Sequence, residues 1–256
     1  MVEVKSLCAG YGNEEILHNI SFSLPEKAVT AIIGPNGCGK STLLKSIIGL
    51  NKRISGEILI DGIDASRLSP AELAKKAAYL PQNRTAPDMT VLKMVLHGRF
   101  AHLSYPRRYR KEDYTAAYEA LCKMGIEHLS EKSMTELSGG TQQKAYIAMA
   151  LAQNSPTVLM DEPTAYLDIS HRIQTMKLCR ELADSGKAVA VVLHDIDLAL
   201  EGADNIIVLQ NGQIKAEACP EKVFESKIID KVFDIKMQRI DGENGWQYYC
   251  GRDFSK

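Results

Sequence analysis

The run Val29-Thr30-Ala31-Ile32-Ile33 leads directly into Gly34-Pro35-Asn36-Gly37-Cys38-Gly39-Lys40-Ser41, and this stretch sets the architecture of the chain. The apolar run is typical of a strand buried on both faces of a parallel sheet. The glycines that follow match the phosphate-binding loop pattern Gly-x-x-x-x-Gly-Lys-Ser, in which backbone amides approach phosphate oxygens. Residues 43–48 then have the pattern of an amphipathic helix. The stretch therefore predicts an α/β fold with a phosphate-binding loop.

Two side chains of this loop have the chemistry that a nucleoside triphosphate requires. We expect Lys40 to reach the β- and γ-phosphates and the Ser41 hydroxyl to ligate magnesium. Cys38 is either an inert small residue or a thiol whose modification blocks the site. The predicted nucleotide-binding residues of the loop are Gly34, Pro35, Asn36, Gly37, Cys38, Gly39, Lys40, Ser41 and Thr42.

Two more apolar runs end in polar side chains. Residues 158–160 precede Asp161 and Glu162, and residues 188–193 precede His194. Because ligands bind at the carboxyl edge of parallel sheets, we expect these ends to meet in one pocket. Asp161 is expected to hold magnesium, and Glu162 to polarise an attacking water.

Three other residues have both a functional and a structural interpretation. His194 could hydrogen-bond a phosphate oxygen, or it is a structural histidine at the end of a core strand. Gln82 could touch magnesium or its water, or it is an ordinary loop glutamine. Tyr11, within Gly10-Tyr11-Gly12, could face a nucleotide base, or it packs like any aromatic residue.

Composition narrows the class of protein. The 256 residues are 45% hydrophobic and carry a net charge of -1, so no overall field favours nucleic acid. The apolar runs are too short to span a bilayer, and the N-terminus lacks the pattern of a secretion signal. Six scattered cysteines without a Cys-x-x-Cys pair favour a reducing cytoplasm over zinc or a disulfide framework.

The pattern of the remaining chain predicts three further parts. Residues 2–4, 20–24 and 56–60 alternate like half-buried strands, which indicates an N-terminal antiparallel β region. Residues from about 83 to 156 have helical patterns and predict a helical subdomain inserted into a single domain of residues 1–256. The C-terminal extension, about residues 220–256, is expected to hold a helix over 221–233 and a hairpin around 241–245.

A second turn of the phosphate-binding kind is Leu137-Ser138-Gly139-Gly140, which opens another helical run. Such a turn leaves backbone N–H groups free to point at an anion. Either this chain has two separate phosphate sites, or each site is built from two chains.

The chain carries a series of short motifs in a fixed order. They are the phosphate-binding loop, Gln82, the Ser138 turn, Asp161-Glu162-Pro163, Leu167-Asp168 and His194. Over about residues 2 to 215 this order and spacing resemble the ATP-binding subunits of ABC transporters. The resemblance implies the ABC ATPase fold, a P-loop NTPase core with a mostly parallel buried sheet, and ATP and Mg²⁺ as cofactors.

The resemblance also implies a role for each matching residue. Tyr11 would stack on adenine, and Ser41, Gln82 and Asp161 would hold magnesium. Lys40, Gln82, Glu162 and His194 would form the catalytic set, with Glu162 as the base. Asp168 would be the D-loop residue. Ser138, Gly139 and Gly140 would contact the ATP of a second copy, giving two composite sites in a head-to-tail dimer.

Three loop segments narrow the resemblance to ATPases of importers for iron–siderophores, haem or vitamin B12. They are Gly98-Arg99-Phe100-Ala101-His102, residues 151–156 and Tyr166-Leu167-Asp168-Ile169-Ser170-His171. The partners implied are permease subunits and, indirectly, a soluble substrate-binding protein, with the chain cytoplasmic and peripheral on the inner face of the membrane. The alternative is a non-transport ABC ATPase of a soluble complex.

Two residues near these motifs need separate interpretation. The family signature has glutamine after its second glycine, but this chain has Thr141 there, with Gln142 next. The glycine amides and Ser138 should keep the phosphate contacts. His171 is interpreted as a packing or interface residue, because no partner ligand has a suitable spacing for a metal.

Overall fold

The centre of the molecule is a six-stranded sheet in the order β10-β9-β3-β8-β7-β6. The computed structural model describes residues 1–251 except 13, 83–84, 166 and 243–244. Strands β9, β3, β8, β7 and β6 are parallel, and β10 is antiparallel to β9. The predicted parallel sheet is therefore confirmed. Its strands are β3 (Ala28–Ile33), β6 (Ala77–Leu80), β7 (Thr157–Asp161), β8 (Ala188–Val192), β9 (Asn205–Gln210) and β10 (Gln213–Ala218).

Strand β3 is buried on both faces. Val29, Ala31 and Ile33 pack into the core that includes the helices after β7 and β8, whereas Ile32 packs into the core on the opposite face. A strand between two apolar layers is mostly apolar on both faces, which explains the run before the phosphate-binding loop, where the buried Thr30 is the polar exception.

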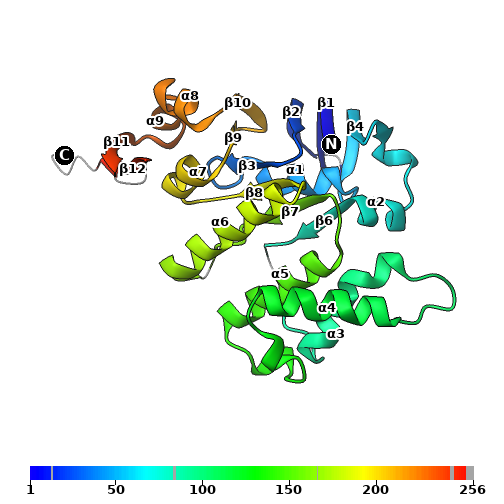
Figure 1. Ribbon diagram of the computed structural model, residues 1–256. Helices are drawn as coiled ribbons and strands as arrows, with labels where there is room; N and C mark the ends of the chain where they lie inside the picture. Colours follow the sequence, from blue (N-terminus) through cyan, green and yellow to red (C-terminus); the bar gives the residue numbers. More distant parts are fainter. Residues whose placement is uncertain (13, 83–84, 166, 243–244, 252–256) are drawn as a thin grey trace.

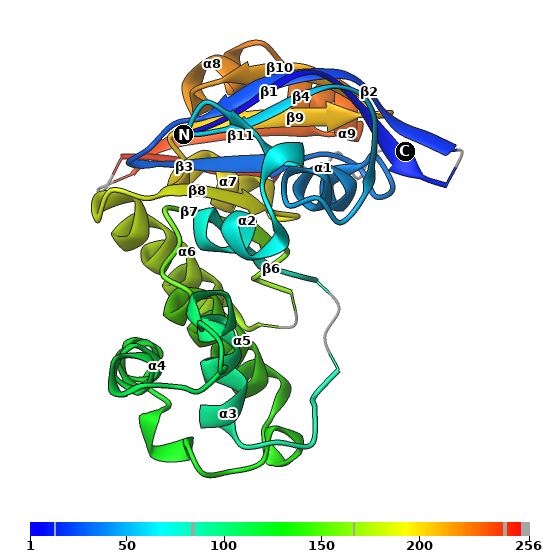
Figure 2. The ribbon, with the colours of Figure 1, turned by 90° about the vertical axis from the view of Figure 1, so that its right-hand side faces the viewer.

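A separate antiparallel sheet lies at the N-terminal side, in the order β2-β1-β4-β5. Helix α1 (Lys40–Ile47) packs between this sheet and the parallel sheet, so the helix after the phosphate-binding loop is held from both sides (Figure 2). The predicted N-terminal antiparallel β region is confirmed. Its strands are β1 (Val2–Tyr11), β2 (Glu14–Leu24), β4 (Lys52–Ile60) and β5 (Ile63–Asp64).

The helices between β6 and β7 lie together on one side of the sheets (Figures 1 and 2). They are α3 (Val91–Leu96), η2 (His97–His102), α4 (Lys111–Lys123), η3 (Glu127–Leu129), η4 (Met134–Glu136) and α5 (Gly139–Ala152). Two short helices, η1 (Ala65–Arg67) and α2 (Pro70–Lys76), precede β6. The division into a domain and a subdomain stays a prediction, and its expected boundary at residue 83 lies outside the described residues.

The C-terminal segment differs from the sequence prediction in one respect. The single helix expected over 221–233 is wrong, because α8 (Pro220–Glu225) and α9 (Ile228–Phe233) are separate helices. Lys227 between them is left-handed (φ 56°), and the Ser226 hydroxyl accepts a hydrogen bond from the backbone N–H of Ile228 at 3.3 Å. This serine contact competes with the backbone hydrogen bonds of a continuous helix.

The expected hairpin is present as β11 (Lys236–Gly242) and β12 (Gly245–Gly251), although its tip, residues 243–244, lies outside the described residues. Tyr248 packs edge-on against Phe224 of α8, with ring centroids 5.2 Å apart. Its backbone N–H donates to Glu201 of α7 (Ile196–Gly202) at 3.1 Å. The hairpin is thereby attached to the helix that follows His194. In the described part of the chain, no helix has the length and apolar character needed to cross a membrane.

Candidate active site

The strand ends predicted to converge do meet in one pocket of about 430 Å³. The pocket lies at the carboxyl ends of β3 and β7. It also lies beside His194, which comes two residues after the end of β8. The described residues that line it are Ile16, Asn36, Gly37, Gly39, Lys40, Ser41, Thr42, Gln82, Glu162 and His194. Segments separated by more than a hundred residues in sequence therefore share one concave surface.

The phosphate-binding loop needs glycine at two positions. A Cβ atom on Gly34 would lie 2.1 Å from the carbonyl oxygen of Leu209, and Gly39 has a φ of 105°. The buried ammonium of Lys40 donates to the carbonyl oxygens of Gly34 at 2.8 Å and Pro35 at 3.0 Å. The loop therefore wraps around its own lysine, which it places at the floor of the pocket.

The carboxylate of Asp161 is almost fully buried, at 1% exposure. Its Oδ1 accepts a hydrogen bond from the Ser41 hydroxyl at 3.0 Å, and its Oδ2 accepts one from the Tyr79 hydroxyl at 3.1 Å. Burial raises the pKa of Asp161, against the lowering effect of these two hydrogen bonds.

The oxygen donors of Ser41 and Asp161 fit a magnesium ion. Mg²⁺ prefers hard oxygen ligands and usually takes only one or two from carboxylates, with phosphate oxygens and water completing its shell. The described residues contain no group of three or more His, Cys, Asp or Glu side chains that could hold a metal. A divalent cation here would also favour the ionised form of Asp161.

Glu162 directly follows β7 and has a left-handed backbone (φ 51°), an uncommon conformation for a residue with a Cβ atom. Its side chain is 11% exposed, and its carboxylate is contacted by two side chains that follow other strands. Gln82 Nε2 donates to Oε2 at 2.5 Å, and His194 Nε2 lies 2.6 Å from Oε1. The structure thus places Gln82 and His194 on one carboxylate at the wall of the pocket.

Tyr11 lies outside this set. Its ring is 46% exposed, and the Lys45 ammonium lies 6.0 Å from the ring centroid. Among the described residues of the N-terminal strands, Ile16 lines the pocket and the predicted Tyr11 does not.

Cys38 faces the interior of the loop. It is 5% exposed, belongs to the core under α1, and burial raises the pKa of its thiol. Because the thiolate is the reactive form, both effects make this cysteine unreactive. The structure therefore favours the inert small residue over the modifiable thiol.

We predict that a bulky maleimide labels Cys122 and Cys250, which are exposed, and leaves Cys38 and Cys179 unlabelled in the folded protein. Cys179 is buried with its pKa raised to about 12 by burial. Peptide mass spectrometry after brief labelling, compared with labelling in urea as the control, measures this. Labelling of Cys38 at the rate of Cys122 would contradict the buried geometry.

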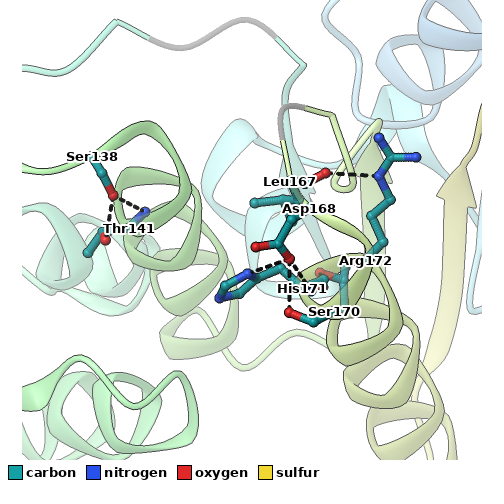
Figure 3. Close-up of polar contacts among 8 residues, drawn as sticks. Ser138, Thr141, Leu167, Asp168, Ser170, His171 and Arg172 are labelled. Carbon is teal, nitrogen blue, oxygen red and sulfur yellow. Dashed lines mark hydrogen bonds and ion pairs between the residues drawn. The ribbon is translucent and has the colours of Figure 1, made fainter.

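The Ser138 turn begins helix α5 away from the pocket. Ser138 is the exposed N-cap residue, and its Oγ accepts a hydrogen bond from the Thr141 N–H at 3.3 Å (Figure 3). The Thr141 hydroxyl lies 2.9 Å from the same Oγ. Gln142 Nε2 donates to the carbonyl oxygens of Met134 and Leu137, both at 3.1 Å. Thr141 therefore holds the side chain of Ser138, and Gln142 holds the backbone that leads into the turn.

Asp168 begins helix α6 (Ile169–Asp184) in a similar way. Its Oδ1 accepts from the His171 N–H at 2.9 Å, and it lies 2.8 Å from His171 Nδ1 and 2.9 Å from Ser170 Oγ (Figure 3). The backbone hydrogen bond from His171 is the main cause that lowers the pKa of Asp168 to about 2. His171 thus holds the aspartate in place, in line with a packing role. Tyr166 lies outside the described residues.

Sequence reasoning assigned no role to Tyr79 or Ile16. Tyr79 lies on β6, where it pairs with Leu159 of β7, two residues before Asp161. Its place near the carboxyl end of a strand was a usable signal, because ligands of α/β folds bind at that edge of the sheet. Ile16 lies on β2 in the antiparallel sheet, and no sequence pattern places that strand above the loop.

Comparison with known proteins agrees with this geometry. A family model described as ABC transporter matches residues 17–165. The chain is 39% identical over 239 residues to the ferric enterobactin transport ATP-binding protein FepC of Escherichia coli (strain K12), covering 93% of this chain and 88% of that protein. It is 38% identical to the petrobactin import ATP-binding protein FpuD of Bacillus anthracis, with the same coverage of 93% and 88%.

A solved structure extends the comparison to the fold. A dimeric ATP-binding cassette in a post-hydrolysis state, bound to ADP and Pi, aligns with a TM-score of 0.75 and 33% identity. The alignment covers 86% of this chain and 99% of that one. The chain therefore belongs to the ATP-binding subunits of ABC transporters, and the reaction of this family is ATP hydrolysis.

Proposed function

We propose that this chain hydrolyses ATP to power a membrane importer of iron chelates. The convergence of Gln82, Glu162 and His194 at the phosphate-binding loop carries the catalytic part of this proposal. The names of the relatives, which transport ferric enterobactin and petrobactin, support the substrate class. Iron–siderophores, haem and cobalamin share the chemistry of a large metal chelate.

In this proposal the loop from Gly34 to Thr42 holds the phosphates, with Lys40 exchanging its carbonyl partners for the β- and γ-phosphates. Glu162 takes a proton from the attacking water. Gln82 and His194 hold the two oxygens of its carboxylate, so that the base is oriented before substrate arrives. Tyr11 stacks on adenine from the rim of the site.

Ser41 and Asp161 would hold Mg²⁺, with Gln82 near its water shell. When bound, the ion neutralises charge on the β- and γ-phosphate oxygens. The pair of oxygen donors 3.0 Å apart supports this assignment.

Ser138, Gly139, Gly140 and Asp168 act on a second copy of the chain. All four lie at the starts of helices and outside the pocket of their own chain. The N-terminus of α5 favours a phosphate through its free N–H groups. The dimeric state of the related cassette with ADP and Pi supports two composite sites.

Permease subunits dock on the helical subdomain, for which we propose residues 83–156. A hollow of about 500 Å³ between α2 and η2 supports this, because it is lined by Ala74, His97 and the half-exposed Phe100. A cytoplasmic helix of the permease would fill it, placing the chain on the inner face of the membrane. A soluble binding protein would deliver the chelate from the other side.

The test is affinity purification of the chain from membranes, followed by uptake assays with radiolabelled ferric siderophore, haem and cobalamin in cells with and without the gene. We expect a polytopic membrane protein to co-purify and uptake of a chelate to require the gene. Glu162→Gln, which should assemble but not hydrolyse ATP, is the matched control. Recovery of a soluble partner alone would instead support the non-transport alternative.

A further inference from the structure

The side chain of Arg172, in the first turn of α6, joins two loops of the site. Its Nε donates to the carbonyl oxygen of Leu167 at 2.9 Å (Figure 3). Its Nη1 donates to Asp195 Oδ1, also at 2.9 Å. Leu167 immediately precedes Asp168, and Asp195 immediately follows His194. One guanidinium therefore links the D-loop to the segment that holds His194.

Both ends of this link are themselves held. On one side Asp168 is fixed by the hydrogen bonds from the His171 N–H and Ser170 Oγ. On the other side His194 Nε2 lies 2.6 Å from Glu162 Oε1. These contacts form a continuous path from the D-loop through Arg172 to Asp195, and through the peptide bond to the histidine that contacts Glu162.

The residue type matters here. The guanidinium is a rigid planar fork, so it can hold a backbone carbonyl and a carboxylate in two fixed directions at once. A lysine ammonium at this position is a single flexible point charge and would not fix both. The Arg172–Asp195 pair is also partly exposed, at 39% and 30% of the two side chains, and such pairs contribute little to stability.

We propose that Arg172 is a positioning residue that couples the D-loop at the dimer interface to His194 in the ATP site. This inference rests on the proposed head-to-tail dimer. Closure of the partner against Asp168 would set the orientation of His194 and, with it, the orientation of Glu162. The site would then hydrolyse ATP efficiently only when the partner is in place.

The experiment compares Arg172→Gln, Arg172→Lys and Asp195→Asn in the full chain. Because small displacements of catalytic groups cost about 10- to 100-fold in rate, we expect kcat to fall by about 10-fold or more in each variant. The KM for ATP should stay within about twofold, since the phosphate-binding loop is untouched. The double variant Arg172→Gln/Asp195→Asn should be no slower than the slower single variant, because the two residues act through one contact.

Arg180→Gln is the matched control. Arg180 lies on the same helix, pairs with Asp204 at 2.9 Å and is 38% exposed, but it contacts neither the D-loop nor the His194 segment. Its kcat should remain within about twofold of wild type, as expected for a surface ion pair. Equal kcat for Arg172→Gln and Arg180→Gln would overturn the proposal, and so would multiplied losses in the double variant.

A second measurement separates coupling from dimerisation. In a Glu162→Gln background, gel filtration with ATP should show the same dimer with and without Arg172→Gln, because Ser138 and the glycine amides are unchanged. Loss of the dimer would mean that Arg172 only shapes the interface, which overturns the coupling role. If wild type itself neither hydrolyses ATP nor dimerises, the proposed function fails first, and that result is read from wild type alone.

Discussion

Glu162→Gln should lower kcat for ATP hydrolysis by about 10²- to 10⁴-fold, the usual contribution of a positioned general base. Glutamine keeps the size of the side chain but cannot accept the proton of the attacking water. ATP binding should persist, because the variant leaves Lys40, Ser41 and the loop amides unchanged. With hydrolysis blocked, an ATP-bound dimer should accumulate.

Phosphate release and gel filtration with ATP measure the two effects of Glu162→Gln. Glu127→Gln, at an exposed position of η3 remote from the pocket, is the matched control and should behave like wild type. A Glu162→Gln variant with wild-type hydrolysis would exclude this carboxylate as the base. A variant that is inactive but monomeric would separate catalysis from the proposed dimer.

Lys40→Ala should weaken ATP binding by about 10- to 100-fold, the loss expected when hydrogen bonds to charged groups are removed. Lys40 is buried, at 5% exposure, and its ammonium donates to the loop carbonyl oxygen of Gly34, so alanine removes a positive charge from the loop itself. Binding of adenosine should change little, because it has no phosphate to contact Lys40.

Calorimetric titration with ATP and with adenosine measures this difference. Lys177→Ala, an exposed lysine of α6, is the control for the loss of one positive charge. Thermal unfolding of Lys40→Ala tests whether the loop carbonyls left without the ammonium destabilise the fold. Equal ATP affinity of Lys40→Ala and wild type would contradict the assignment of Lys40 to the phosphates.

The sequence was sufficient for much of the fold. Continuous apolar runs identified β3, β7 and β8, and the rule that parallel strands end at one edge placed Asp161, Glu162 and His194 together. These predictions succeeded because strand burial and the turn after β3 depend on residues close together in the chain. The break between α8 and α9 at Lys227 was not predicted, because the hydrogen bond to the Ser226 hydroxyl outweighs the helical pattern of the sequence.

The chemistry of the site was less predictable. The sequence patterns allowed both a functional and a structural interpretation of His194 and Gln82. In the structure both side chains contact Glu162. Cys38 remained open in the same way until its burial was known. Contacts of this kind depend on side-chain directions and on the left-handed turn at Glu162, which no local pattern encodes.

Residue order and spacing alone were enough to predict the nucleotide-binding fold and the resemblance to the family, because a glycine loop between a buried strand and a helix directs backbone amides at phosphate. Only the folded molecule shows which side chains contact the same carboxylate, and only it shows that Arg172 links Leu167 to Asp195. The reason is physical: strand register sets these distances, as in the pairing of Asp161 with Val192, and it brings residues that are distant in sequence within hydrogen-bonding range.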